Sequence, residues 1–152
     1  MLNNPRPIRG DIPILVGGSG ERKTLRLVAR YADGSNIFGG PDQVRHLLGV
    51  LGEHCTEAGR DPAEITKTRL GTLAIAPSHE EAERAIALWP DRLALPPERL
   101  QATLTVGDPD EVGERVRALF DAGLDGLVFN MPNPWDLDAV ALAGETLSRA
   151  AS

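Results

Sequence analysis

The sequence has little cysteine, few aromatic residues and no excess of basic charge. Its 152 residues include one cysteine, Cys55, so no disulfide can form within the chain. Aromatic residues make up only 4% of the chain, and no apolar run approaches the ~20 residues that a membrane-spanning helix needs. The 16 basic and 22 acidic side chains give a net charge of −6. This charge disfavours nucleic acid and anionic membranes as partners, because both reward basic surfaces.

The remaining composition is that of a globular domain. Hydrophobic residues make up 41% and charged residues 25% of the chain, which is enough to bury a core. The first ten residues are rich in Pro and Asn and lack the apolar segment of a signal peptide. We therefore expect residues 1–10 to form an extended lead-in and residues 11–152 to form a single α/β domain of a cytoplasmic protein. Cys55 falls on the apolar face of a predicted helix, which favours a buried thiol over a nucleophile.

Strand-like apolar segments alternate with amphipathic helical segments along the chain. The expected strands are 12–16, 35–38, 68–76 and 126–130, and the expected helices are 21–32, 41–58, 78–89, 109–122 and 135–149. Residues 90–103 contain three prolines and are expected to form a loop. The alternation predicts a parallel sheet with flanking helices. Four strand–helix units are about half of an eight-unit (β/α) barrel, but the pattern also allows an open doubly wound sheet.

Capping residues mark several of these helix ends. Asp61 and Asp108 each precede a proline, which places an N-cap before a first helical Pro. Ser78 with Glu81 has the spacing of a capping box. Gly59 follows the apolar stripe of the second helix and is expected to end it in a left-handed conformation.

The first expected strand stops at Gly17-Gly18-Ser19-Gly20, and a basic helix is expected to follow directly. Glycines let backbone N–H groups approach a ligand closely, and a helix N-terminus attracts anions. The Ser19 hydroxyl and the Arg22 guanidinium could complete a site for one phosphate group. An ordinary strand-to-helix turn explains the same glycines equally well, because so short a motif is not specific.

No other residue pattern identifies a catalytic or metal site. The histidines His46, His54 and His79 do not have the spacing of metal ligands, so we expect no metal. Asn36 and Asn130 lie at strand ends, where they could face a ligand or satisfy loop backbone groups. No catalytic residue can be assigned from the sequence.

Five segments of the sequence carry a further signal: Pro13 to Asn36, His54 to Pro62, Thr68 to Thr72, Gly107 to Val112 and Ala122 to Asn130. Together and in this order, they resemble segments of the bacterial luciferase-like monooxygenase superfamily. The chain most resembles the branch of this superfamily that uses the deazaflavin coenzyme F-420 (F420). The resemblance implies the C-terminal half of a (β/α)8 TIM barrel, with about four parallel strands, and the family's N-terminal half has no counterpart here. It also implies F420 or FMN as cofactor, with Gly17, Gly18, Ser19, Gly20 and Arg22 at its phosphate region.

The implied function is that of a flavin- or deazaflavin-dependent oxidoreductase, acting by hydride transfer or monooxygenation. Two alternatives remain: a non-catalytic half-barrel fragment that associates with itself, and a weak phosphate-ligand binding module. A half-barrel leaves unpaired strand edges, so we expect a homodimer or higher homo-oligomer. The residues expected at buried strand positions are Ile14, Val16, Leu73, Ile75, Leu127 and Phe129.

Overall fold

The computed structural model describes residues 8, 10, 12–87, 89, 96 and 102–151. Most of the expected lead-in and of the expected loop at 90–103 therefore lies outside the described residues. The elements are β1 (Leu15–Gly17), α1 (Thr24–Tyr31), β2 (Gly34–Ile37), α2 (Pro41–Ala58), the 3-10 turn η1 (Pro62–Glu64), β3 (Thr66–Ile75), α3 (His79–Ala87), β4 (Leu104–Gly107), α5 (Pro109–Asp121), β5 (Gly126–Asn130) and α6 (Leu137–Ala150).

The sheet is parallel throughout and is centred on the long strand β3. The first part of β3 pairs with β2, as far as Arg69, and the last part pairs with β4, from Thr72 onward. Strand β5 pairs with Thr68 to Thr72, so it overlaps both neighbours and must lie on the opposite side of β3. It follows that β2 and β4 succeed one another along the same edge of β3.

The described residues form five strands, one more than the four strand segments expected. The strand missed by the sequence reading is β4, whose four residues are too few to show a period of two and follow a proline-rich segment. It becomes a strand because it pairs with β3, which lies about thirty residues earlier in the chain. Long-range pairing of this kind overrides weak local propensity.

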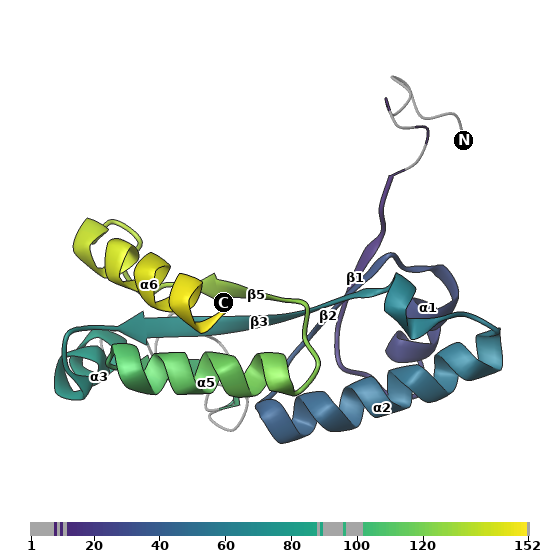
Figure 1. Ribbon diagram of the computed structural model, residues 1–152, viewed down its shortest axis with the longest axis horizontal. Helices are drawn as coiled ribbons and strands as arrows, with labels where there is room; N and C mark the ends of the chain where they lie inside the picture. The colour runs from purple at the N-terminus through teal and green to yellow at the C-terminus, as the bar shows by residue number, and fades with distance from the viewer. Residues whose placement is uncertain are drawn as a thin grey trace.

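Two buried clusters stabilise the two ends of β3. The first joins α1, α2 and the end of α5 through residues such as Leu25, Leu47 and Leu119. The second joins β3, α5 and α6 through Leu73, Val116 and others. Figure 1 shows β1, β2, α1 and α2 around one end of β3, α3 and α6 at the other, and α5 alongside the strand.

Several helix ends are as the sequence predicts. The Asp108 carboxylate accepts hydrogen bonds from the N–H groups of Asp110 and Glu111, and this forms a full capping box for α5. Asp61 caps η1 by accepting from Ala63 N–H at 2.9 Å, and Gly59 ends α2 at φ 66°. The expected start of the first helix at residue 21 is wrong: residues 21–23 form a turn and α1 begins at Thr24.

The two faces of the sheet differ in polarity. Leu73 and Ile75 are buried in the second cluster as expected, with Leu127 and Phe129 packed against it. Ile14, also expected to be buried, is 51% exposed, because it precedes β1 and only its backbone is held, by Asp33. The opposite face has polar and small residues: Asn36, Thr68 and Gly126 share a level across β2, β3 and β5, and Thr72 is level with Asn130 further along the sheet.

Candidate functional site

The glycine turn after β1 is held against the end of β2. Gly18 has a φ of 133°, and its N–H donates to the Asn36 carbonyl at 2.9 Å. The Ser19 Oγ accepts from the Phe38 N–H, also at 2.9 Å. One predicted phosphate donor, the Gly18 N–H, is therefore engaged within the protein, whereas the Ser19 hydroxyl hydrogen stays available because its oxygen acts as the acceptor.

Close packing requires two of these glycines. A Cβ at Gly20 would lie 2.8 Å from Thr24 Oγ1, and one at Gly18 would lie 3.2 Å from Thr24 Cγ2. At Gly17, in contrast, a Cβ would meet nothing within 4 Å. Gly18 and Gly20 thus bring the turn close to the start of α1, and Gly17 leaves open space. Arg22 is exposed in the turn before α1 rather than in its first helical turn.

Two histidines of α2 hold the residue that follows the turn. His46 Nε2 lies 3.0 Å from the Glu21 carboxylate, and His54 Nε2 lies 2.8 Å from the Glu21 carbonyl oxygen, to which it donates. Nothing in the sequence indicates these contacts, since His46 is 25 and His54 is 33 residues from Glu21 and no local motif links them. These two contacts hold Glu21, the residue that directly follows Gly20, against α2.

Asn36 presents a fixed amide beside the turn. Its Nδ2 donates to Thr68 Oγ1 at 2.9 Å, while the Thr68 hydroxyl donates to the Ser35 carbonyl at 3.1 Å. The Thr68 hydroxyl hydrogen is used in the second bond, so the Thr68 oxygen must act as the acceptor in the first. The Asn36 amide nitrogen therefore points to Thr68, and the Asn36 Oδ1 points away from it. Gly17 is level with Asn36 on the neighbouring strand, so a side-chain-free position adjoins this amide.

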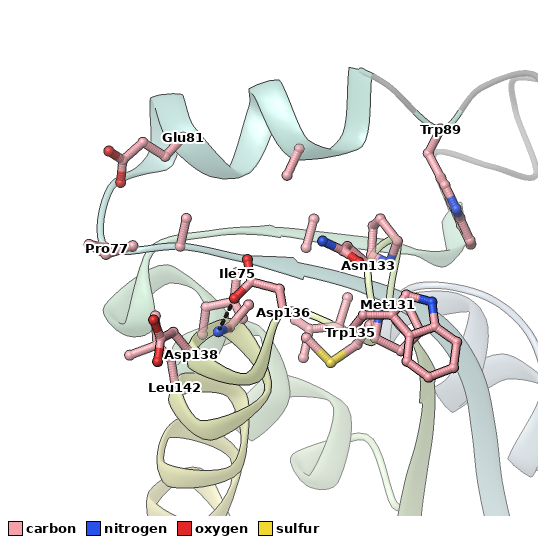
Figure 2. A pocket seen from close by; sticks show the side chains of 17 residues that line it. Ile75, Pro77, Glu81, Trp89, Met131, Asn133, Trp135, Asp136, Asp138 and Leu142 are labelled. Carbon is pink, nitrogen blue, oxygen red and sulfur yellow. Dashed lines mark hydrogen bonds between the residues drawn. The ribbon is translucent and has the colours of Figure 1, made fainter.

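A separate cleft of about 1050 Å³ opens at the ends of β3 and β5. Residues from the end of β3, from α3 and from the segment between β5 and α6 form its walls. Figure 2 shows α3 on one side of the cleft and Met131 to Asp138 on the other, with Ile75 between them. Strand ends of a parallel sheet are the usual place for a ligand, so the position suits a binding site.

The cleft is lined by indoles and carboxylates. Trp89 and Trp135 come from opposite walls, and the acidic residues are Glu81, Asp136 and Asp138. Asp136 accepts a hydrogen bond from Ala139 N–H at 3.1 Å and so caps α6. The expected start of the last helix at Trp135 is wrong, because α6 begins after this cap, at Leu137. None of the described lining residues is basic.

The cleft is well separated from the glycine turn. Gly17 is level with Asn36 and Thr68, whereas the β3 residues that line the cleft, Leu73 to Ile75, are five to seven residues further along the strand than Thr68. At about 3.3 Å per residue this places the two regions roughly 17–23 Å apart along the strand. The sequence predicts a phosphate site at the glycine turn, whereas the cleft lies at the ends of β3 and β5.

Arg69 is a buried cation where β2 gives way to β4. Its Nε donates to the Gly39 carbonyl at 2.7 Å, and its Nη2 donates to the Ala102 and Thr103 carbonyls at 3.1 and 3.0 Å. Gly71 leaves it room, since a Cβ there would collide with the Arg69 Nη1. Burial, with a smaller effect of Arg115, lowers the pKa of Arg69 to about 10, so it remains a cation at neutral pH.

Two other groups have shifted pKa values. Burial raises the pKa of the Cys55 thiol, which agrees with the expected structural role. A hydrogen bond from His79 Nδ1 to Glu111, at 2.8 Å, raises the pKa of His79, as does the charge of Glu111. Both histidine and carboxylate are solvent-exposed, and they link the starts of α3 and α5.

The described residues contain no group of three or more His, Cys, Asp or Glu side chains that could hold a metal ion. In the same part of the chain, no helix has the length and apolar character needed to cross a membrane.

Comparison with known structures identifies the fold. The coenzyme F420-dependent tetrahydromethanopterin reductase of Methanopyrus kandleri matches with a TM-score of 0.74 and 20% identity, over 95% of this chain and 53% of that one. The FMN complex of the oxygenating constituent of 3,6-diketocamphane monooxygenase from Pseudomonas putida matches with a TM-score of 0.67 and 22% identity, over 92% and 49%. The fold is thus an α/β fold that corresponds to about half of a TIM-barrel protein.

Sequence comparisons agree with the structural ones. The chain is 28% identical to the F420-dependent glucose-6-phosphate dehydrogenase of Microbacterium testaceum (strain StLB037) in an alignment 160 positions long, which covers 90% of this chain and 47% of the relative. The chain therefore spans about half the length of this curated relative. The model of the luciferase-like monooxygenase family matches residues 1–94, which include the glycine turn, α2 and β3. This protein belongs to the luciferase-like monooxygenase family.

Proposed function

We propose that the chain is the C-terminal part of a flavin- or deazaflavin-dependent oxidoreductase and binds the cofactor phosphate at Gly17, Gly18, Ser19, Gly20 and Arg22. The observation that carries this proposal is the fixed glycine turn at a strand end of a luciferase-like fold. The names of its relatives include F420-dependent and FMN-containing enzymes, which supports either cofactor. Such a cofactor supplies hydride transfer or oxygen activation, and the protein binds and orients it.

The residues of the turn fit a phosphate group. The Ser19 hydroxyl retains its hydrogen as a donor, and Arg22 and Lys23 contribute two exposed cations. Gly17 leaves space for the group, because no atom lies within 4 Å of the place its Cβ would take. The Glu21 carboxylate lies 3.0 Å from His46 Nε2, and Arg22 and Lys23 place two exposed cations beside this one anion. The basic side chains therefore outnumber the acidic one at the turn.

Asn36 extends the proposed site by one strand. Its Oδ1 is an acceptor directed away from Thr68, next to the open space at Gly17. Adjacent parallel strands are about 4.8 Å apart, so a group that contacts Asn36 would be only a few atoms from a phosphate on the turn. Hydroxyl groups of the polyol chain of the cofactor would be in that place.

The second part of the proposal concerns assembly. In the described part of the chain, β1 pairs only with β2 and β5 only with β3, so each has an unpaired outer edge. Leu15 and Val128 expose apolar side chains on the polar face of the sheet. We propose that a second copy covers these edges in a homodimer, and light scattering coupled to gel filtration tests it. A stable monomer of 16.3 kDa contradicts the dimer.

Cofactor titration tests the site. FMN and F420 should bind to the wild-type protein, and Arg22→Gln should weaken FMN binding by about fivefold while leaving riboflavin, which lacks the phosphate, unchanged. Arg30→Gln is the matched control, because it removes the same charge from the other end of α1. Absence of binding at millimolar FMN and F420 contradicts the proposal. It would favour the alternative, a non-catalytic module that only associates with itself.

A further inference from the structure

The cleft between α3 and the start of α6 differs in chemistry from the glycine turn. Its two indoles come from separate walls, and Trp135 is 87% exposed. An indole so exposed has a large apolar surface in contact with water, and covering that surface is favourable. The aliphatic residues Leu73, Ile75 and Leu142 continue the apolar lining inward.

Among the described residues that line the cleft, all the charged ones are acidic. In Figure 2, Glu81 and Asp138 lie toward one end of the cleft, and Trp89 and Trp135 lie toward the other. No Lys, Arg or His is found among the described lining residues. A phosphate ester placed here would face carboxylates and no cation among the described lining residues, so this lining disfavours anionic ligands. A cation gains from the carboxylates and also from the faces of the indoles.

We infer that this cleft binds an amphipathic organic cation, with its ring or alkyl body against Trp89 and Trp135 and its ammonium group near Glu81 and Asp138. As the substrate site of an oxidoreductase this inference rests on the proposed function, whereas as a binding site it stands on the cleft alone. The inferred ligand is a cation, and so it differs in charge from the sugar phosphate in the name of one relative, a glucose-6-phosphate dehydrogenase.

Calorimetric titration of the full chain with three probes of similar shape tests the inference. The probes are 2-phenylethylammonium, the neutral 2-phenylethanol and the anionic phenyl phosphate, with glucose 6-phosphate as a fourth ligand. The ammonium compound should bind about fivefold more tightly than the alcohol at low salt, and the two phosphates should bind more weakly than the alcohol. Raising the salt concentration should reduce only the preference for the cation.

Variants assign the preference to particular residues. Glu81→Gln with Asp138→Asn should lower the affinity for the ammonium compound to that for the alcohol. The matched control, Glu114→Gln with Glu145→Gln, removes two exposed charges from α5 and α6 outside the cleft and should change neither affinity. Trp135→Leu should weaken both ligands by about two- to fivefold, and because this side chain is exposed the variant should fold.

Equal binding of the ammonium compound and the alcohol overturns the inference, as does tighter binding of either phosphate. The inference is also overturned if the control variant loses as much affinity for the ammonium compound as the cleft variant does. The effect would then come from the net charge of the protein and not from the cleft. Titration with FMN on the same protein is independent of these results. Failure at the cleft with FMN binding intact therefore refutes this inference alone, and the reverse result refutes the proposed cofactor site alone.

Discussion

The glycine turn near the first half of β3 and the cleft at its far end are built differently. Backbone and side-chain hydrogen bonds from β2 and α2 hold the turn, and a large buried cluster lies beneath it. The cleft is bordered by the exposed Trp135 and by carboxylates whose structural task is to start helices. A turn held by hydrogen bonds suits a ligand group of fixed shape such as a phosphate. An open cleft with exposed apolar side chains suits a ligand that contributes its own apolar surface.

The largest expected loss of stability comes from replacing Arg69, which lies between the two regions. Arg69→Leu removes the donors from three carbonyl oxygens and should lower the free energy of unfolding by about 4 kcal/mol. Urea unfolding measures the change. Arg115→Leu removes an exposed arginine from α5 and should change stability by no more than about 0.5 kcal/mol. A similar effect of the two substitutions would mean that Arg69 does not join the regions.

Core substitutions show whether the regions unfold together. Leu47→Ala in the first cluster and Leu73→Ala in the second should each cost about 3 kcal/mol. Because β3 and α5 contribute to both ends of the molecule, we expect one transition. Each variant should therefore speed alkylation of the buried Cys55 by roughly a hundredfold. If Leu73→Ala lowers stability but leaves Cys55 protected, the two regions open independently.

Ser19→Ala sharpens the contrast between a tethered turn and an open cleft. It deprives the Phe38 N–H of its acceptor and should cost about 1 kcal/mol in thermal or chemical unfolding. Trp135→Leu removes a larger side chain from the cleft but should leave stability nearly unchanged, because that side chain is mostly exposed. The reverse order of effects would indicate that the cleft, and not the turn, is the rigid part.

The smallest effect is the pH dependence of the contact between α3 and α5. The pKa of His79 is raised in the folded protein, so the stabilisation is complete below the ordinary histidine pKa and disappears as the pH rises through the higher folded value. NMR titration of the His79 ring measures this pKa. Glu111→Gln keeps an acceptor for the α5 cap and should bring the pKa back toward its ordinary value. An unchanged pKa in this variant contradicts the assigned cause.

Local chemistry predicted many of the elements. The apolar stripe of α2, the Asp-Pro starts of η1 and α5 and the αL glycine after α2 each depend on residues close together in the chain. The alternation of strands and helices predicted the parallel sheet, and five ordered segments indicated the family that the family model confirms. The predicted phosphate residues depend on the same local reading, and titration remains their test.

Long-range contacts decided what the sequence reading missed. β4 is too short to be recognised until β3 provides its partner, and Ile14 looks like a core residue until the sheet is seen to begin after it. The bonds from His46 and His54 to Glu21 depend on how α2 lies beside the glycine turn. Such contacts join residues whose separation along the chain has no periodic signature.

The sequence by itself determined the class of fold, several of the helix caps and the family, because each is encoded by residue types at short and regular spacing. Only the tertiary structure decided that β2 and β4 share an edge and that Arg69 fills the junction between them. It also decided that carboxylates of α3 and α6 and the indoles of Trp89, after α3, and Trp135, before α6, border one cleft. The physical reason is that packing and pairing energies depend on neighbours in space, and these neighbours are chosen by the whole fold rather than by any one segment.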